Sequence, residues 1–515
     1  MQIIQLSVLP NTAASTELLR ELLTEELHVD QFEFKIAKRS IDARRKPVTV
    51  NLKVEVYLDG ESMPELVTEN NYQDVKDAEP IIIVGFGPAG MFAALKLIEL
   101  GLKPIIIERG KDVRSRRRDL AAINKNHIVN PESNYCFGEG GAGTYSDGKL
   151  YTRSKKRGDV NAILATLVEH GAPEEIMVDA HPHIGTNKLP NVVTAIRETI
   201  LEHGGEIRFD TKLTDIIVTD NQVEGVVTQN DEKILSKNVI LATGHSARDI
   251  FHLLHNKGIT IESKPFAMGV RVEHPQSLID SIQYHCKEKS EHLPPASYKL
   301  VQQVKDRGVF SFCMCPGGII APCATAPGEI VTNGWSPSKR NNPYANSGIV
   351  VSVEAEDLIP FKEHGPLAGL AFQADVEKKA FIAGGNKGDT GQLAPAQRLT
   401  DFIKGKISTD LPECSYVPGI VSAPLHEILP KEITKRLQEG FTKFGYKMKG
   451  YMTSDAVIVG VESRTSSPVK IPRDRESFQH PDVKGLFPCG EGAGYAGGIV
   501  SAAIDGQKCA EAIVA

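Results

Sequence analysis

The chain has 515 residues, more than one ordinary domain holds, which predicts two or three folded units. Apolar residues make up 41% and charged residues 24%, as in globular proteins, and no apolar run reaches the roughly 18 residues that would cross a bilayer. The net charge of −6 argues against nucleic acid as the main partner. Eight irregularly spaced cysteines, and a start at Met1–Leu6 without an export signal, favour the reducing cytoplasm.

The first part of the chain predicts a small, separate α+β module. Ile3–Val8 predicts a strand, Thr16–Leu27 an amphipathic helix, and Phe32–Ala37 and Val48–Leu58 two further strands. A basic stretch between the last two strands suggests docking of an acidic protein partner, although a solvated hairpin tip is favoured. This stretch comprises Lys38, Arg39, Arg44, Arg45 and Lys46.

An apolar run at Ile81–Val84 leads directly into the turn Gly85–Gly90, which predicts a strand followed by a phosphate-binding turn. Gly85 allows the tight bend, Gly87 lets the main chain approach a diphosphate, and Gly90 lets the next helix pack close to the strand. A lone glycine triplet is a weak signal. Here the strand, the glycines and the helix occur in register, so the signal is strong.

A second parallel strand is predicted at Pro104–Ile107, and it ends at Glu108. Glu108 lies 23 positions after Gly85, near the interval of about 20 residues expected for the carboxylate that binds ribose hydroxyls. The basic helix that follows is expected mostly at the surface, with one arginine reaching a diphosphate. Its arginines are Arg114, Arg116, Arg117 and Arg118.

The glycine-rich segment Gly138–Lys149 predicts an active-site loop. Its glycines permit close approach of the backbone to a ligand, and Ser146, Asp147 and Lys149 are the polar groups it presents. Lys149 would hold an anionic substrate or offset negative charge on a reduced cofactor. A structural turn with a solvated lysine explains the same residues equally well.

The middle of the chain predicts the rest of a parallel sheet. Glu206–Phe209 would supply a third parallel strand, and Asn238–Leu241 would return to the sheet and end in Ala242–Gly244. Between these strands the sequence predicts a meander of three strands, at Thr214–Thr219, Val223–Gln229 and Lys233–Leu235.

Cys313 and Cys315 are two positions apart, which on a regular strand places both side chains on one face. A redox thiol pair, a metal site shared with Cys323, and small buried strand residues are the interpretations, and the last is favoured. No metal site is predicted, because no fourth ligand falls at a characteristic spacing.

Arg464, within Glu462–Thr465, is a candidate for binding a substrate carboxylate through both arms of its guanidinium group. Arg271, Arg340 and Tyr495 are weaker candidates for the same pocket. Structural ion pairing or packing is the alternative for all of them.

A second glycine-rich turn, Gly490–Gly498, follows Gly485–Cys489 about 400 residues after the first. Both turns can bring backbone N–H groups against phosphate or carbonyl oxygens. One elongated ligand, held at its diphosphate by the first turn and at its far end by the second, explains both, and we interpret it as FAD.

These features resemble a known group of proteins. The turn at Gly85–Gly90, Glu108, Ala242–Gly244 and Gly490–Glu491 are similar to the FAD-binding superfamily that includes glutathione reductase and p-hydroxybenzoate hydroxylase. Three further segments resemble a bacterial family of uncharacterised FAD-dependent dehydrogenases. They are Asn134–Leu150, Phe312–Gly318 and Glu462–Val469.

The resemblance implies FAD and assigns residues to its parts. Glu108 would bind the adenosine ribose, Lys212 and Leu213 would border the adenine, and Glu491 would bind the ribitol in place of the more common aspartate. The helix from Ile499 to Val514 would point its positive end at the flavin. The full cofactor set is Gly85, Gly87, Pro88, Ala89, Gly90, Glu108, Arg109, Gly141, Ala142, Lys149, Lys212, Leu213, Ala242, Thr243, Gly244, Gly490, Glu491, Gly498 and Ile499.

The predicted fold is α/β, with a discontinuous Rossmann-like FAD-binding domain, an inserted mixed α+β substrate domain and the small N-terminal module. We expect the module at 1–75, with a polar linker at 69–74. The FAD-binding domain is expected at 79–124, 190–254 and 451–515, and the substrate side at 125–189 and 255–450.

The predicted function is an FAD-dependent oxidoreductase that transfers hydride through flavin N5, with Lys149, Asp147 and Arg464 as candidate catalytic residues. Its substrate would be a small molecule, and NAD(P)H would be a transient reductant, because the chain has only one dinucleotide fingerprint. The alternatives are a flavin-dependent monooxygenase and a flavin-bearing interaction protein without catalysis.

Overall fold

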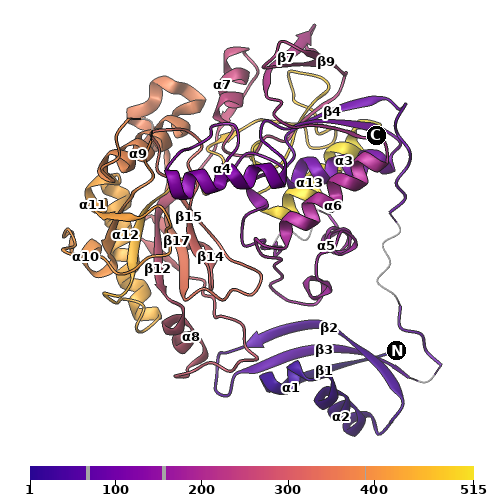
Figure 1. The fold of residues 1–515 in the computed structure, drawn as a ribbon, viewed down its shortest axis with the longest axis vertical. Helices are drawn as coiled ribbons and strands as arrows, with labels where there is room; N and C mark the ends of the chain where they lie inside the picture. Colours follow the sequence, from indigo (N-terminus) through magenta and orange to yellow (C-terminus); the bar gives the residue numbers. More distant parts are fainter. Residues whose placement is uncertain (59, 65–69, 153–157, 389) are drawn as a thin grey trace.

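The computed structural model describes residues 1–58, 60–64, 70–152, 158–388 and 390–515 (Figure 1). The first residue of the predicted linker, at position 69, lies outside these ranges. Within them, no helix combines the length and the apolar character needed to cross a membrane.

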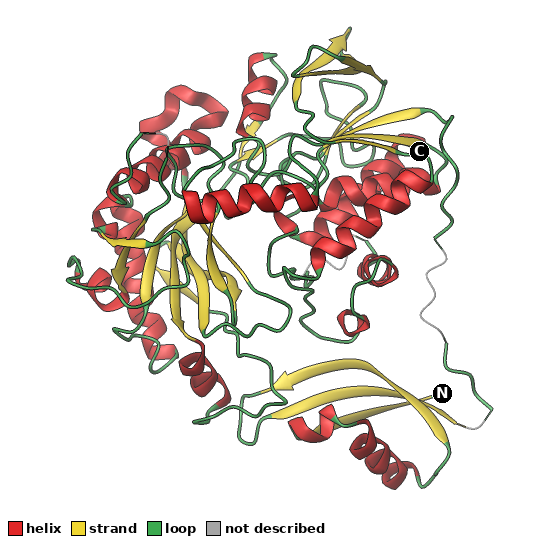
Figure 2. Cartoon of the chain, viewed as in Figure 1, coloured by secondary structure: helices red, strands yellow, loops and turns green. Residues whose placement is uncertain are grey.

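The N-terminal module is a three-stranded antiparallel sheet in the order β1-β3-β2, with helices on one face (Figure 2). The predicted helix is confirmed as α2, where Leu19 and Leu23 are buried against the sheet. The elements are β1 (Gln2–Val8), α1 (Pro10–Ala14), α2 (Thr16–Leu27), β2 (Phe32–Asp42) and β3 (Thr49–Leu58).

Strand β2 runs five residues beyond its predicted end at position 37 because a shift in register between Ile36 and Lys38 lets the pairing with β3 continue. Lys38 and Arg39 therefore lie within a strand, which corrects their assignment to a hairpin tip. The backbone of Arg39 pairs with residues 178–180, and its side chain bonds Asp179 at 2.7 Å. The edge of the module is thus attached to the rest of the chain.

The second sheet has five parallel strands in the order β22-β10-β4-β5-β6. The chain moves outward from β4 through β5 and β6, then returns to β10 on the other side of β4. Such a reversal leaves a crevice at the carboxyl ends of the strands, where ligands bind in folds of this kind. The strands are β4 (Pro80–Val84), β5 (Lys103–Ile107), β6 (Glu206–Arg208), β10 (Val239–Leu241) and β22 (Leu486–Pro488).

One face of this sheet is covered by α3, flanked by α6 and α13 (Figure 1). The contact between α3 and α13 depends on Gly506, because a Cβ there would lie 2.0 Å from the carbonyl oxygen of Ala89. Helix α5 packs on α13, and its residues share the core of the parallel sheet. This corrects the assignment of α5, within 125–189, to the substrate side, whereas Val129 and Tyr135 do pack against Ala321 and Cys323. The helices are α3 (Pro88–Glu99), α4 (Val113–Asn126), α5 (Val160–Glu169), α6 (Leu189–Glu202) and α13 (Ile499–Val514).

The predicted meander is confirmed, as an antiparallel sheet in the order β7-β8-β9. Asp220 and Asn221 form its first turn with φ of +49° and +61°, the left-handed conformation that tight hairpins require. Its strands are β7 (Leu213–Thr219), β8 (Gln222–Thr228) and β9 (Lys233–Leu235), and α7 (Arg248–Asn256) follows β10.

The third large sheet has seven strands in the order β13-β14-β17-β12-β20-β18-β19. Strand β20 pairs with β12 and β18 at the centre, which corrects the assignment of all of 451–515 to the FAD-binding domain. The strands are β12 (Phe266–Pro275), β13 (Val301–Val304), β14 (Arg307–Cys315), β17 (Tyr344–Val353), β18 (Ala394–Arg398), β19 (Ile420–Ser422) and β20 (Val457–Glu462).

Helices cover the outer side of this sheet and bury one large apolar core against it. They are α8 (Gln276–Tyr284), α9 (Ala368–Ala383), α10 (Leu399–Lys404), α11 (Leu425–Ile428) and α12 (Lys431–Lys447). Two short sheets complete the fold, β11 (Glu262–Ser263) with β21 (Val469–Lys470) and β15 (Ile319–Pro322) with β16 (Thr332–Trp335).

Candidate functional site

An inner cavity of about 300 Å³ lies where both glycine-rich turns meet. It opens at the carboxyl ends of β4, β10 and β22, and the seven-stranded sheet contributes Phe312 and Cys313 to its lining. The structure brings to this cavity every residue of the predicted cofactor set except Gly90, together with Asp147 and Arg464. Segments some 400 residues apart in sequence therefore line one space.

The first turn is shaped by three glycines with different surroundings. Gly85 has φ of +100°, and a Cβ there would lie 2.5 Å from the carbonyl oxygen of Ala242, so the turn runs against the end of β10. Gly90 packs behind the turn, where only glycine fits, because a Cβ there would lie 2.1 Å from the carbonyl oxygen of Gly85. A Cβ on Gly87 would meet nothing nearer than Gly141, at 3.8 Å, and a ligand can approach the backbone there.

The Glu108 carboxylate joins the first turn to the glycine-rich loop. It is 5% exposed, and it accepts hydrogen bonds of 2.9 Å from the backbone N–H groups of Phe86, Gly110 and Gly138. A carboxylate has about four acceptor positions, so one position is left for a ligand. Glu108 thus fixes the turn as well as lining the cavity.

The second turn is fixed by the last helix. The N–H of Gly490 donates to Asp505 at 2.8 Å, and Asp505 is held in turn by Arg473 at 2.6 Å. Gly498, with φ of +91°, precedes Ile499 at the start of α13. The N–H groups in the first turn of a helix have no partner within it and carry partial positive charge, so α3 and α13 both direct donors toward the cavity.

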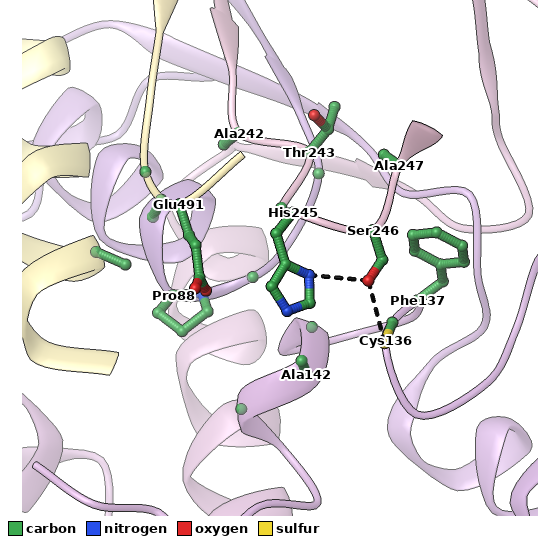
Figure 3. Close-up of a pocket in the computed structure, with 18 of the residues that line it drawn as sticks. Pro88, Cys136, Phe137, Ala142, Ala242, Thr243, His245, Ser246, Ala247 and Glu491 are labelled. Carbon is green, nitrogen blue, oxygen red and sulfur yellow. Dashed lines mark hydrogen bonds between the residues drawn. The ribbon is translucent and has the colours of Figure 1, made fainter. Parts of the chain in front are cut away.

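His245 and Ser246 line the cavity and were missed by the sequence analysis (Figure 3). His245 Nδ1 lies 2.8 Å from Ser246 Oγ, which also contacts Cys136 Sγ at 3.6 Å. Burial lowers the pKa of His245 against the opposing charge of Glu491, so the ring is neutral near pH 7. The available signal was position, because both residues lie within five positions of Leu241, the carboxyl end of parallel strand β10.

Lys149 and Asp147 form an ion pair beside the cavity, with Nζ 3.5 Å from Oδ2. Arg340 also pairs with Asp147, at 2.7 Å. Burial opposes these charges, but Lys149 and Arg340 outweigh it and lower the pKa of Asp147. Lys149 further donates to the carbonyl oxygen of Met314, so it is held in place and is not a freely solvated lysine.

Cys313 departs from a regular strand, with φ of +45° at a bulge in β14. The two thiols therefore do not simply share one strand face, and the Lys149 Nζ lies 3.9 Å from each sulfur. A hydrogen bond from Cys315 lowers the pKa of Cys313; burial opposes this, and Lys149 and Arg271 reinforce it.

In the described ranges, the sulfur atoms of Cys313, Cys315 and Cys323 do not all lie within 4.8 Å of one another. One set of three residues in the described ranges meets this distance: Cys489, Asp505 and Cys509. The Asp505 carboxylate is already paired with Arg473, so this group is an ion pair with two thiols beside it.

Four hydrogen bonds to neighbouring side chains hold the Arg464 guanidinium group, which corrects its assignment as a substrate anchor. It bonds Glu377 at 2.9 and 2.8 Å, Glu329 at 2.7 Å and Thr325 at 2.6 Å. Burial disfavours ionisation of Glu377, but Arg248 and Arg464 outweigh it and lower its pKa to about 2. Structural ion pairing, the alternative, describes Arg464 better.

For Arg271 the structure shows the structural alternative, and Arg116 differs from expectation. Arg271 is fully buried and pairs with Glu462 at 2.8 Å. Arg116, expected at the surface or at a diphosphate, is also fully buried and donates to the carbonyl oxygens of Asn134, Tyr135 and Glu139. It shapes the start of the glycine-rich loop from behind.

Where Arg109 and Lys212 line the inner cavity, charged side chains form a network around them. Arg109 pairs with Glu132 and Asp249, and its guanidinium lies 4.3 Å from the ring centroid of Phe137. Lys212 pairs with the same two carboxylates. These side chains are neutralised within the protein, so this part of the cavity offers a ligand mainly backbone and ring surfaces.

Comparison with known proteins finds two family models in the chain. A model described as FAD-dependent protein, C-terminal domain-like, matches residues 265–465, and a domain of unknown function matches residues 1–57. The first match runs from the start of β12 past the end of β20 and so covers the central strands of the seven-stranded sheet.

Among curated proteins, an uncharacterized protein of Clostridium beijerinckii is 42% identical over 500 residues, covering 93% of this chain and 92% of that protein. A digeranylgeranylglycerophospholipid reductase of Methanosarcina acetivorans is 27% identical over 177 residues, covering 33% of this chain and 39% of that protein. The first similarity extends over nearly the whole length of both chains, and the second over about a third of this chain.

Two solved structures resemble the fold weakly. A glycine oxidase of Bacillus cereus has 13% identity and a TM-score of 0.31, covering 85% of this chain and 95% of that one. A geranylgeranyl bacteriochlorophyll reductase-like protein of Thermoplasma acidophilum has 13% identity and a TM-score of 0.33, covering 84% and 77%. We draw no conclusion about function from similarities this weak.

Proposed function

We propose that the chain, which belongs to the same family as the uncharacterized protein of Clostridium beijerinckii and contains a region matched by the model of an FAD-dependent protein, is an FAD-dependent oxidoreductase. The observation that carries this proposal is the inner cavity, where the turns at Gly85–Gly90 and Gly490–Gly498 meet. In the finer version of the proposal, the cofactor is held as in the superfamily of glutathione reductase and p-hydroxybenzoate hydroxylase.

The residues of the cavity fit FAD. The open space above Gly87 and the start of α3 suit a diphosphate, because backbone N–H groups and the positive end of a helix favour anions. Glu108 has an acceptor position left for a ribose hydroxyl. The start of α13 at Ile499 would face the flavin, where its positive end favours a reduced, anionic ring.

When bound, FAD would supply two-electron transfer, and the chain would bind, orient and shield the reactants. Lys149 would hold an anionic group of the substrate at the edge of the cavity, because its ammonium is fixed by Asp147 and Met314. Neutral His245 would hold or accept a proton at Nε2, since its Nδ1 is engaged by Ser246. The eight unpaired cysteines suit the reducing cytoplasm in which we place the protein.

The experiment that tests the proposal is the visible absorption of the purified protein before and after addition of FAD. A flavin spectrum is expected, and a colourless protein that takes up no added FAD would refute the proposal. Anaerobic mixing with NADH, NADPH and a panel of metabolites then separates a dehydrogenase from a monooxygenase. Flavin reduction by a metabolite without oxygen is the outcome expected for a dehydrogenase.

Gly87→Ala tests the position of the diphosphate. A methyl group there meets no protein atom nearer than 3.8 Å, so folding should be unaffected, but it occupies the space of the diphosphate. We expect FAD affinity to fall about tenfold or more, a loss of about 1.4 kcal/mol. Gly308→Ala is the matched control, because its nearest neighbour, on Phe310, also lies at 3.8 Å but outside the cavity. Equal FAD affinity of the two variants would contradict this placement.

A further inference from the structure

A second, larger cavity of about 1450 Å³, here called the outer chamber, lies on the far side of Lys149 and Cys313 from the inner cavity. Its walls come from the β2–β3 hairpin of the N-terminal module, from α8, from β14 and from the end of α12. Figure 1 shows the module beside α8. The hairpin is held there by His285, whose Nε2 lies 3.1 Å from the carbonyl oxygen of Ala43.

The lining of the outer chamber is strongly basic in a chain whose net charge is −6. It includes six cationic side chains and no aspartate or glutamate: Arg44, Lys149, Lys299, Arg340, Lys447 and Lys449. Within the described ranges, these six form ion pairs with only two carboxylates, Asp42 and Asp147. The six positive charges therefore exceed the two carboxylates by four, and three of the cations form no ion pair in these ranges: Lys299, Lys447 and Lys449.

The two cavities meet at residues that both share. Lys149 and Cys313 line the inner cavity and the outer chamber alike, and Gly497, one residue before the cap of α13, lines the chamber. A molecule in the chamber would thus reach the edge of the cofactor cavity next to a fixed ammonium. Tyr151 and Tyr446 add largely exposed aromatic surface to the chamber wall.

We propose that the outer chamber binds the substrate, and that the substrate is an organic polyanion with at least two carboxylate or phosphate groups. One anionic group would pair with Lys149, and the others would pair with lysines near the opening. The chamber is larger than the roughly 300–1,000 Å³ of ordinary small-molecule sites, so it accommodates a molecule of metabolite size or larger. This inference rests on the proposed oxidoreductase function, because it places the substrate beside the FAD cavity.

Calorimetric titration of the purified protein with pyrophosphate and with citrate tests the charge of the chamber and separates phosphate from carboxylate recognition. We expect one or both anions to bind, with an affinity that falls as salt is raised. The variant K299Q/K449Q removes two exposed lysines for which the described ranges show no ion pair. Binding should weaken about twofold to thirtyfold in this variant, the range for two exposed charge pairs.

The matched control is K404Q/K406Q, which removes two exposed lysines at the end of α10, away from the chamber lining. This variant should bind each anion with the affinity of the parent. Binding of neither anion, or equal weakening by both variants, would overturn the proposal. If the parent protein does not bind FAD, the proposed function is refuted. The anion titration is a separate result, since it needs no bound cofactor.

Alkylation of Cys313 gives a second, local measurement. The same thiolate attacks anionic iodoacetate and neutral iodoacetamide and displaces iodide from both. The rate with iodoacetate divided by the rate with iodoacetamide therefore reports the potential in the chamber and not the thiol pKa. We expect this ratio, mapped to Cys313 by mass spectrometry, to be about three- to tenfold higher in the folded than in the unfolded protein. The ratio should fall in K299Q/K449Q and not in K404Q/K406Q. A ratio unchanged by folding would count against a basic chamber.

Discussion

At the residue scale, the buried carboxylate of Glu377 shows how the site is anchored. It is fully buried between Arg248 and Arg464, and Ser463 also donates to it. The network ties α9 to the end of β20 beside the inner cavity. Removing one partner of such a pair leaves a buried charge without compensation, which costs about 3–5 kcal/mol.

Glu377→Gln should therefore lower the stability of the protein by about 3–5 kcal/mol at pH 7. Glu439→Gln is the control, because Glu439 forms an exposed pair with Lys443 on α12 and should cost under about 1 kcal/mol. Urea unfolding followed by fluorescence measures both. Similar unfolding midpoints for the two variants would contradict a stabilising role for the buried network.

The same carboxylate predicts how stability depends on pH. The folded pKa of Glu377 is about 2, below its ordinary value of 4.5, so its contribution is present above pH 4.5 and is lost as pH falls toward 2. The parent protein should lose stability over this interval, and Glu377→Gln should lose less over the same interval. Urea midpoints measured between pH 5 and pH 3 check this, and parallel curves would show that Glu377 is not the group responsible.

Single residues also show what a sequence can and cannot reveal about a site. The positions of Gly85 and Glu108 in the site can be predicted from sequence, because the spacing within a strand-turn-helix unit determines their roles. His245 carries no such spacing signal, and only its position after a parallel strand points to it. From sequence alone, Arg464 was predicted to bind an anionic substrate. Its partner Glu377 lies 87 positions away in sequence, so this pair cannot be recognised before the fold is known.

At the scale of elements, the contact between α3 and α13 sets the distance between the two glycine-rich turns of the inner cavity. Gly506 lets the backbones touch at Ala89. Alanine normally stabilises a helix by about 1 kcal/mol over glycine. Here the added methyl group would press against a backbone carbonyl that cannot move without shifting the first turn.

Gly506→Ala should consequently lower both the unfolding temperature and the affinity for FAD, against the trend of helix propensity. Gly445→Ala is the matched control, because Gly445 lies in α12 and its near neighbour is the flexible side chain of Met452. That control should be neutral or stabilising. Thermal unfolding and FAD titration of both variants decide, and a stabilised Gly506→Ala would contradict the contact.

Element boundaries were predictable where local signals are strong. The helices at Thr16–Leu27 and Ile499–Val514 match the prediction. The first has an apolar face and is capped by the Ser15 side chain, and the second begins directly after Gly498. The sheet to which a strand belongs was less predictable. The apolar run of β20, Val457–Glu462, is equally suited to either large sheet, and only tertiary packing decides that it joins the seven-stranded one.

At the scale of the whole molecule, the inner cavity joins the early part of the chain to the late part. Any ligand that binds only the folded cavity stabilises the fold by an amount set by its concentration over its Kd, about 2.7 kcal/mol at a hundredfold excess. Removing FAD should therefore lower the unfolding temperature, and adding it back should restore it. Gly87→Ala should show a smaller shift than Gly308→Ala, and no shift in the parent would contradict cofactor binding at this cavity.

The two turns that meet at the junction of α3 and α13 are synthesised at different times. A ribosome adds about 5–20 residues per second, so the interval between Gly85 and Gly490 lasts roughly 20–80 s. During that time the first turn exists without its counterpart, and a nascent chain cannot yet enclose its ligand. If the inner cavity binds FAD as proposed, capture of the cofactor would wait until translation has passed α13, and a prematurely terminated product lacking that helix would stay empty.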